Sequence, residues 1–417
     1  MMAPRFILSR MYTDVRIDPA LCIRCRGTKM LCGLPYCPIL VRTRVKTYVE
    51  ALAGRTSVAG SSPPSVFVGR VGWPRVRVYP SVPPLDGDTS RLEDPRAWLE
   101  MSLEEFLSQR LILARGAFEV DVDSARRPPR VLEDVQILAL SPRPAEAELE
   151  LKKPLRPEPA LDEHSPPFGP ASPLRSIRLG SLPPPEKIVE RAYSDLDYPA
   201  GEAMWDLYRS GVDVHRISRL LSVGALGVRR RLVPTRWSIT AVDKQISDRL
   251  LERIKRMPVI DRYLVYVRKT RGNTFVGLLA PRGFMYEWGE AWWPSTTWNY
   301  FGSSPEVEVD WEGPRGRSTY PSIGGCYYAA RLAAAEALEA MGRQAAVVLW
   351  REIYPGFDLP IGVWFVRENV RALFRSKPEK FDDLGEALSY MASHLKLPLD
   401  IWYSRSHVVK ILRTTLK

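Results

Sequence analysis

The chain has 417 residues, of which 45% are hydrophobic and 26% are charged, a composition typical of a globular protein rather than a disordered one. Its length exceeds what one hydrophobic core usually supports, so two domains are expected. No stretch approaches the roughly 20 uninterrupted apolar residues of a membrane span. The segment 1–10 is too short and too charged for a secretory signal, which predicts an intracellular, cytoplasmic location and no membrane partner.

Positive charge is in excess along the chain. The chain has 60 Lys and Arg residues and 48 Asp and Glu residues, which gives a formal charge of +12 and a pI near 9.5. Such an excess attracts polyanions, and nucleic acid is therefore the first candidate partner. A solvated basic surface with no specific partner is the alternative that charge alone leaves open.

Four cysteines near the start form the most distinctive local motif. Cys22, Cys25, Cys32 and Cys37 are spaced C-x2-C, six residues, C-x4-C. Four thiolates suit tetrahedral Zn²⁺ and leave no open coordination position, so a structural zinc site is predicted rather than a catalytic one. An iron–sulfur cluster stays as the alternative because Pro38 follows the last cysteine, as in some ferredoxin motifs.

The first half of the chain then alternates between strand patterns and proline. Residues 65–70 and 76–79 are predicted strands, and Arg70 at the end of the first could contact phosphate. Between residues 127 and 186 proline is dense, so this region is expected to be irregular and extended. Two strand-like pieces, VQILAL and AELELK, interrupt it.

Helical patterning resumes at residues 187–224 and again after Pro234. Apolar residues recur every four positions between Val242 and Ile254, which predicts an amphipathic helix. Thr240 and Asp243 fit a capping box at its start, which would give Asp243 a structural role.

Arginines just before this helix form the leading anion-binding candidate, because a helix N-terminus and guanidinium groups both favour phosphate. The predicted nucleic-acid-binding residues are Arg70, Arg229, Arg230, Arg231 and Arg236. If the protein is an enzyme, the candidate catalytic residues are Arg236, Ser238 and Asp243.

The remaining chain predicts a strand pair at 263–269 and 274–280, followed by an aromatic-rich stretch that fits core packing better than an exposed stacking platform. A helix at 325–341, the strand AAVVLW and a further helix make a compact αβ unit. The expected fold is α+β, with mixed sheets and packed helices in two domains, residues 1–300 and 301–417.

Several strings resemble the archaeal Nre family: CIRCRGTKMLCG, SPPSVFVGR, RLVPTRWSITAVD, PSIGGCYYAARLA and GVWFVRENVR. The resemblance spans essentially the whole chain. It implies a zinc-bearing N-terminal region, a distinct C-terminal region, a role in DNA repair, and binding to the replication sliding clamp through a C-terminal motif.

The C-terminus departs from a clamp-binding motif, because SRSHVVKILRTTLK has no glutamine and no aromatic residue after Tyr403. The residues that could still serve are Val409, Ile411, Leu412 and Leu416.

Two functions follow from the sequence. The first is a DNA-binding accessory factor that recruits other repair proteins. The second is an enzyme acting on nucleic acid, such as a nuclease or a nucleotide- or NAD-dependent modifying enzyme, with its site near residues 229–243. No local nucleotide-binding or hydrolase motif favours the second.

Overall fold

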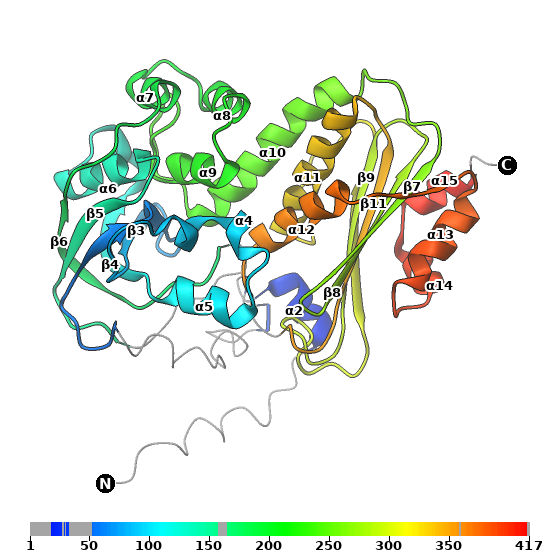
Figure 1. Ribbon diagram of the computed structural model, residues 1–417, viewed down its shortest axis with the longest axis horizontal. Helices are drawn as coiled ribbons and strands as arrows, with labels where there is room; N and C mark the ends of the chain where they lie inside the picture. Colours follow the sequence, from blue (N-terminus) through cyan, green and yellow to red (C-terminus); the bar gives the residue numbers. More distant parts are fainter. Residues whose placement is uncertain are drawn as a thin grey trace, which may run out of the picture.

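The computed structural model describes residues 18–26, 29, 31–32, 52–156, 165–357 and 360–414. Two six-stranded mixed sheets lie in this part of the chain, which confirms the α+β class (Figure 1). Sheet 1 has the spatial order β1 (Ser57–Ser62), β5 (Ala145–Leu151), β6 (Ala171–Leu179), β4 (Ala114–Asp121), β3 (Arg75–Val82) and β2 (Ser65–Val68). Sheet 2 has the order β10 (Glu306–Glu312), β9 (Met285–Trp292), β11 (Ala346–Ile353), β8 (Asn273–Ala280), β7 (Tyr263–Thr270) and β12 (Glu379–Phe381).

Helices surround and connect these sheets. Those of the first half are α2 (Pro19–Cys25), η2 (Ser90–Glu93), α4 (Pro95–Trp98), α5 (Leu103–Leu111), η3 (Val122–Arg126), α6 (Arg130–Leu140), α7 (Lys187–Ser194), α8 (Ala200–Arg209) and α9 (Val214–Ser222). Those of the second half are α10 (Thr235–Ile254), α11 (Gly325–Met341), α12 (Trp364–Arg375), α13 (Leu384–Ser393), α14 (Leu399–Arg405) and α15 (Val408–Thr414).

The proline-dense region is more regular than the sequence predicts. The piece AELELK forms β5 as expected, and it pairs antiparallel with both β1 and β6. The piece VQILAL is the end of helix α6, so its prediction as a strand was wrong. Most described prolines of this region lie before or after these elements and bound them, whereas Pro173 lies inside β6.

Sheet 2 is built from both sides of the boundary expected near residue 300. Strands β7, β8 and β9 precede it, whereas β10, β11 and β12 follow it. Every residue of β8, β9 and β11 is buried, because helices cover both faces of the sheet's centre. The hairpin of β7 and β8 and the strand β11 confirm the predicted strands here.

A layer of helices joins the two sheets into one hydrophobic core. In Figure 1, α10, α11 and α12 lie between the half that contains sheet 1 and the face of sheet 2. The largest buried cluster runs from Val66 and Val78 of sheet 1, through Val242 of α10 and Leu332 of α11, to Phe275 of sheet 2. The position of these helices therefore sets how the two halves of the molecule meet.

The C-terminal helices α13, α14 and α15 cover the other face of sheet 2 (Figure 1). Trp402 of α14 stacks on Trp350 of β11, with ring centroids 4.9 Å apart. Gly289 of β9 makes this contact possible, because a Cβ atom at this position would lie 2.8 Å from the Trp402 ring. In the described part of the chain, no helix combines the length and apolar character needed to cross a bilayer.

Candidate functional site

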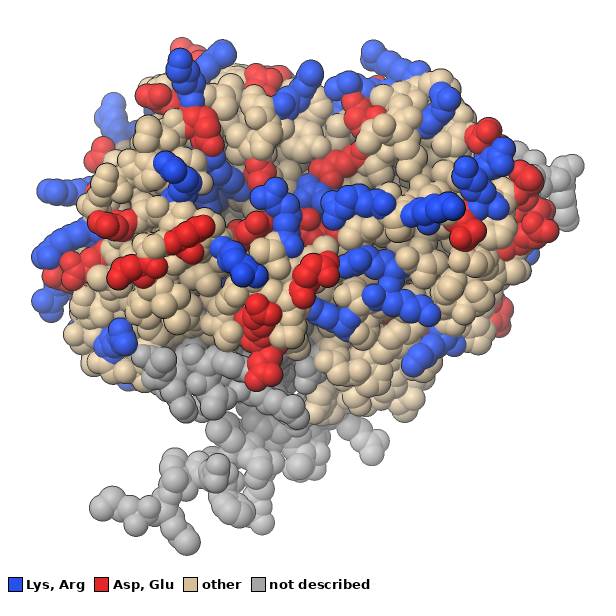
Figure 2. Space-filling view, in the orientation of Figure 1, with Lys and Arg blue, Asp and Glu red and all other residues tan. Residues whose placement is uncertain are grey.

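A basic groove runs beside the N-terminal half of α10, and we call it the α10 groove. It has a volume of about 620 Å³. Its described lining includes five cationic residues and no acidic one; the cations are Lys29, Arg70, Arg236, Lys244 and Arg317. On the face drawn in Figure 2, by contrast, Lys and Arg side chains are interspersed with Asp and Glu. Five cations thus line the groove, and Lys244 and Arg317 are paired there with Asp248 and Asp310, which lie outside the lining.

Local structure explains why residues far apart in the sequence meet there. Thr235, the first residue of α10, accepts a hydrogen bond at its hydroxyl from the backbone N–H of Val68 at 2.8 Å. This bond ties the end of β2 to the start of α10, so that Arg70 and Arg236 line the same groove. Both arginines were predicted from the sequence as phosphate contacts.

Aromatic side chains also line the groove. Trp237 is 44% exposed and Tyr320 is 53% exposed, although rings of this size are usually buried. Trp73 lies against Trp237, with ring centroids 6.2 Å apart, and Tyr320 lies against Tyr328 at 6.3 Å. Exposed rings among cations form a surface suited to flat, negatively charged ligands.

Four residues of the groove were not predicted from the sequence: Lys244, Arg317, Tyr320 and Tyr328. Lys244 lies two turns after Arg236 on the same face of α10, a spacing that could have marked it. Arg317 and Tyr320 come from the loop before α11, and no local pattern connects that loop with α10. Arg317 is held by Asp310 at 2.8 Å and by the carbonyl of Thr319 at 2.7 Å.

The three candidate catalytic residues do not converge. Arg236 lines the α10 groove, whereas Ser238 and Asp243 are buried on the core side of α10. The Ser238 hydroxyl donates to the Thr235 carbonyl at 3.0 Å, within the helix. The predicted capping box was also wrong, because α10 begins five residues before Thr240 and Asp243 lies in the helix interior.

The predicted run of three arginines does not act as one surface. Arg230 is only 3% exposed, and it donates to the carbonyls of Tyr193 at 2.6 Å and Asp195 at 3.0 Å. Arg231 is paired with Asp123, while Arg229 is exposed. Arg230 therefore holds the chain together instead of facing a ligand, and it is not part of the α10 groove.

The cysteine motif begins on helix α2. Cys22 and Cys25 are one turn apart on this helix, and Cys37 lies outside the described residues. Arg26 ends the helix and reaches the buried Glu290 of sheet 2 at 2.5 Å and the Cys326 sulfur at 3.6 Å. Helix α2 is thereby anchored on sheet 2. Among the described residues, no three His, Cys, Asp or Glu side chains are grouped so that they could hold a metal ion.

The C-terminal residues considered for clamp binding lie against sheet 2. Val409 and Leu412 are buried in the core between α15 and the sheet, and Ile411 packs beside them. Leu416 lies outside the described residues. Any partner that takes Val409 or Leu412 into a pocket would first have to move α15 off the sheet.

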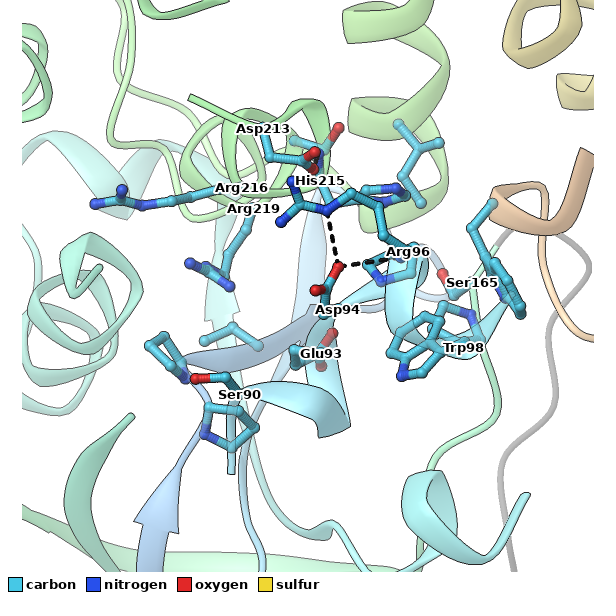
Figure 3. A pocket seen from close by; sticks show the side chains of 18 of the residues that line it. Ser90, Glu93, Asp94, Arg96, Trp98, Ser165, Asp213, His215, Arg216 and Arg219 are labelled. Carbon is cyan, nitrogen blue, oxygen red and sulfur yellow. Dashed lines mark hydrogen bonds and ion pairs between the residues drawn. The ribbon is translucent and has the colours of Figure 1, made fainter. Parts of the chain in front are cut away.

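A second, deeper cavity lies where α4, α9 and α12 meet, and we call it the central cavity. Its volume is about 250 Å³. Figure 3 shows Asp94 and Arg96 on one side and Asp213, His215 and Arg219 of the α9 segment on the other. The residues come from both halves of the chain, so no sequence pattern indicated this cavity.

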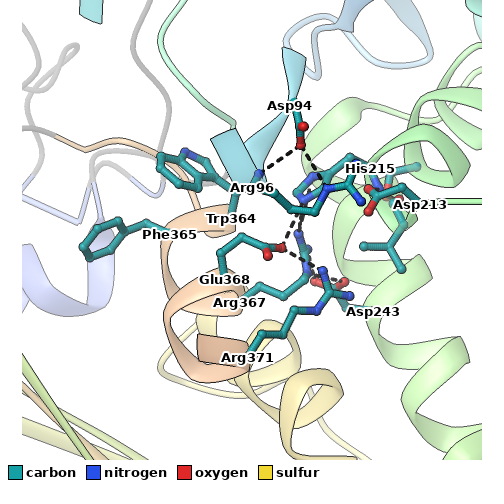
Figure 4. Close-up of polar contacts among 12 residues, drawn as sticks. Asp94, Arg96, Asp213, His215, Asp243, Trp364, Phe365, Arg367, Glu368 and Arg371 are labelled. Carbon is teal, nitrogen blue, oxygen red and sulfur yellow. Dashed lines mark hydrogen bonds and ion pairs between the residues drawn. The ribbon is translucent and has the colours of Figure 1, made fainter. Parts of the chain in front are cut away.

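A network of buried charges forms the wall of the central cavity next to α10 (Figure 4). Arg367 of α12 pairs with Asp243 of α10 through two contacts, 3.0 Å from Nε to Oδ1 and 2.5 Å from Nη2 to Oδ2. The same guanidinium lies 3.1 Å from Nε2 of His215. Glu368 lies 3.7 Å from His215 and is paired with Arg371 at 2.7 Å.

This network shifts the acid titration of Glu368. Burial alone would raise its pKa, but the contact with His215 and the positive charges of Arg371 and Arg367 lower it from 4.5 to about 2. A carboxyl whose pKa is lower in the folded than in the unfolded protein stabilises the fold above the unfolded value. That contribution is lost as the pH falls from about 4.5 towards 2.

We therefore expect Glu368→Gln to lower the melting temperature at pH 7, and the difference from the parent protein to shrink between pH 4.5 and pH 3. Thermal melts at pH 7, 5, 4 and 3 measure this, with the exposed Glu386→Gln as the control. A difference that stays constant from pH 7 to pH 3 would contradict the role given to the Glu368 charge.

The fold and the sites define a two-sheet α+β protein with a basic, aromatic groove. A family model described as "Archaeal Nre, N-terminal" matches residues 31–299, and one described as "Archaeal Nre, C-terminal" matches residues 312–417. The chain therefore belongs to the archaeal Nre family. The two matches divide near residue 300, inside sheet 2.

Curated relatives are similar over nearly their whole length. The chain is 46% identical to "DNA repair protein NreB" of Archaeoglobus fulgidus over 389 residues, which covers 93% of this chain and 97% of that protein. It is 34% identical to "DNA repair protein NreA" of the same organism, covering 88% of this chain and 92% of the relative. It is 33% identical to "DNA repair protein NreA" of Haloferax volcanii, with 88% and 90% covered. No solved structure was found to match the chain.

Proposed function

We propose that this protein is a DNA-binding accessory factor in DNA repair and that the α10 groove holds DNA. The names of the three relatives support the repair role. The observation that carries the binding site is the groove itself, in which five cations and no described acid surround exposed rings. Cations attract the phosphate backbone, and each neutralised phosphate contributes to binding by releasing counterions.

The groove fits a single strand better than a duplex. Trp237 and Tyr320 present ring faces or edges to solvent, and the bases of a single strand can stack on such rings. In a duplex the bases already stack on one another, so the rings would have no partner. Arg70, Arg236 and Lys244 would then hold the phosphates on either side.

Replacing Trp237 by alanine is expected to weaken single-stranded DNA binding by about ten- to a hundredfold, because one stacked base contributes roughly 1–3 kcal/mol. The change should affect duplex binding much less. Fluorescence anisotropy with a labelled oligonucleotide and its duplex measures both. Phe301→Ala is the matched control, since Phe301 is also exposed and aromatic but does not line the groove.

Charge removal separates a groove contact from a general charge effect. Arg236→Ala with Lys244→Ala should lower the slope of log affinity against log salt by about 0.7 for each lost phosphate contact. The exposed Lys380→Ala on β12 should leave the slope unchanged. Equal slopes for the groove variant and the parent protein would remove the groove from the proposal.

We further propose that Cys22, Cys25, Cys32 and Cys37 bind a structural Zn²⁺, with an iron–sulfur cluster as the alternative. Thiolates are the usual ligands of a closed zinc site, and the anchoring of α2 through Arg26 would let the metal fix the N-terminal segment on sheet 2.

Cys22→Ser with Cys25→Ser is expected to remove about one equivalent of metal per chain and to make the N-terminal segment sensitive to protease. Elemental analysis of the purified protein and limited proteolysis measure this, with the parent protein as the reference. The same elemental analysis distinguishes zinc from iron. Purified parent protein without either metal would end the proposal.

A contact with the sliding clamp stays a proposal that depends on α15. It would require Val409 and Leu412 to leave the core of sheet 2. Size-exclusion chromatography with purified clamp, using the full chain and a variant truncated before Ser406, tests this. Co-elution that is lost on truncation would support it.

A further inference from the structure

Arg219 lines the central cavity and has no carboxylate partner among the residues that the structure describes. Several other charges around the cavity are paired: Glu93 with Arg110 at 2.9 Å, Asp94 with Arg96 at 3.1 Å, and Arg367 with Asp243. Arg216 is turned outward to Glu186, which it contacts at 2.6 Å. The remaining guanidinium on α9 is that of Arg219.

One hydrogen bond positions the Arg219 side chain, and its other N–H donors point towards the cavity. Its Nε donates to the carbonyl of Ala139 at 3.3 Å. Among the described residues, neither of its Nη atoms has a hydrogen-bond partner. Figure 3 shows this guanidinium extending from α9 towards the side where Glu93 and Ser90 line the cavity. Two parallel N–H donors in this arrangement match two oxygens of a phosphate.

Partial burial makes the Arg219 charge sensitive to the groups around it. Removal from water lowers the pKa of Arg219 to about 10, and the neighbouring Arg216 acts in the same direction. Glu93 and Asp213 act in the opposite direction, but Glu93 is already paired with Arg110 and Asp213 accepts the backbone N–H of His215 at 2.9 Å. An incoming anion would therefore meet a partly buried cation that is already oriented.

The size and walls of the cavity restrict the ligand. A volume of about 250 Å³ lies below the range of roughly 300–1,000 Å³ that drug-sized ligands occupy. Pro142, Pro144 and Phe168 give an apolar side, and the exposed Arg143 lies between the two prolines at the rim. A single phosphorylated unit with a small organic group suits these dimensions.

We propose that the central cavity binds a phosphomonoester, with the phosphate on the Nη atoms of Arg219 and with Arg143 attracting it at the rim. The proposal does not depend on the α10 groove, which is lined by other residues. The phosphate could belong to a free nucleotide or to the terminal phosphate of a DNA strand, because both present the same dianion.

Isothermal titration calorimetry of the full chain with inorganic phosphate, dAMP and deoxyadenosine tests the phosphate requirement. A 5′-phosphorylated oligonucleotide and its 5′-hydroxyl counterpart test the two sources. We expect dAMP or the phosphorylated oligonucleotide to bind at least tenfold more tightly than its counterpart without phosphate. Selective binding of dAMP would indicate a free nucleotide, and selective binding of the phosphorylated end would indicate a DNA terminus.

Variants assign the binding to the cavity. Arg219→Gln should weaken binding of the phosphate-bearing probe by about ten- to a hundredfold, as expected for loss of a charge-assisted pair of hydrogen bonds. Arg143→Gln should weaken binding of the same probe severalfold, and its exposed position puts folding at little risk. Arg229→Gln, an exposed arginine outside the cavity, is the matched control, and Trp237→Ala should leave dAMP binding unchanged.

Circular dichroism and the melting temperature establish that Arg219→Gln is folded before its affinity is compared. The proposal is overturned if no phosphate-bearing probe binds, or if probes with and without phosphate bind equally. It is also overturned if folded Arg219→Gln and Arg143→Gln bind as the parent protein does. Loss of single-stranded DNA binding in Trp237→Ala together with intact dAMP binding would separate this cavity from the α10 groove.

Discussion

Asp243→Asn is expected to destabilise the protein by about 3–5 kcal/mol, because it leaves the charge of Arg367 buried without its partner. Asp243 and Arg367 are almost completely buried and joined by two contacts. Burial raises the pKa of Asp243, and the charge and hydrogen bonds of Arg367 oppose that rise. The pair stands between α10 and α12, so its loss should loosen the layer that joins the two sheets.

Urea unfolding of the parent protein and of Asp243→Asn measures this loss. Lys244→Ala is the matched control on the same helix, since its side chain is half-exposed and its pair with Asp248 should contribute less than about 1 kcal/mol. Asp243→Leu combined with Arg367→Met should recover much of the stability, because an apolar pair needs no compensation for buried charge. A loss below about 1 kcal/mol in Asp243→Asn would show that the pair does not hold the layer.

Elements with a strong local pattern could be predicted from the sequence. The β7 and β8 hairpin follows from two apolar runs that flank Gly272, and α11 follows from an alanine-rich helix pattern that ends at Gly342. The piece VQILAL carries no such information, because a short apolar run fits a buried strand and a buried helix equally. The preceding residues decide, since Leu132 lies three positions before Val135 and adds the helical period that makes the piece the end of α6.

The start of α10 illustrates a second limit. The sequence favours a helix start at Thr240, yet Thr235 follows Pro234 and the helix already begins there. Thr235 is held by the N–H of Val68, a contact between residues separated by more than 160 positions. Tertiary contacts of this kind override local capping preference. Asp243 therefore lies in the buried helix interior instead of the predicted helix end.

The candidate sites also differ in how far the sequence predicts them. Arg70 and Arg236 could be predicted, because each lies at the end of a recognisable element and carries the charge that phosphate needs. The central cavity could not be predicted, since Asp94, Arg219 and Arg367 come from three distant segments and each has an ordinary local role. Charge pairing across the fold, and not the sequence around each arginine, distinguishes Arg219 from the paired arginines.

Glu287→Ala is expected to release the C-terminal helices from sheet 2. This buried carboxylate accepts hydrogen bonds from Trp350 at 3.1 Å, from the Ser406 hydroxyl at 2.6 Å, and from the backbone N–H groups of His407 at 2.7 Å and Val408 at 2.9 Å. Alanine would leave all four donors without this acceptor, at a cost of roughly 1 kcal/mol or more for each. We therefore expect a loss of about 3–5 kcal/mol in the free energy that holds α15 in place.

Hydrogen exchange at the amides of α15 measures this directly, with Glu386→Ala on the exposed side of α13 as the control. Exchange in α15 should accelerate by several orders of magnitude. Exchange in β8 and β11 should change little, because Glu352 of β11 still accepts the N–H groups of Lys396 and Leu397 and keeps that part of the chain on the sheet. Unchanged protection of α15 would mean that apolar packing alone holds the helix. Acceleration confined to α15 would mean that the C-terminal helix can leave the sheet without unfolding it, which is the condition that any partner for Val409 and Leu412 requires.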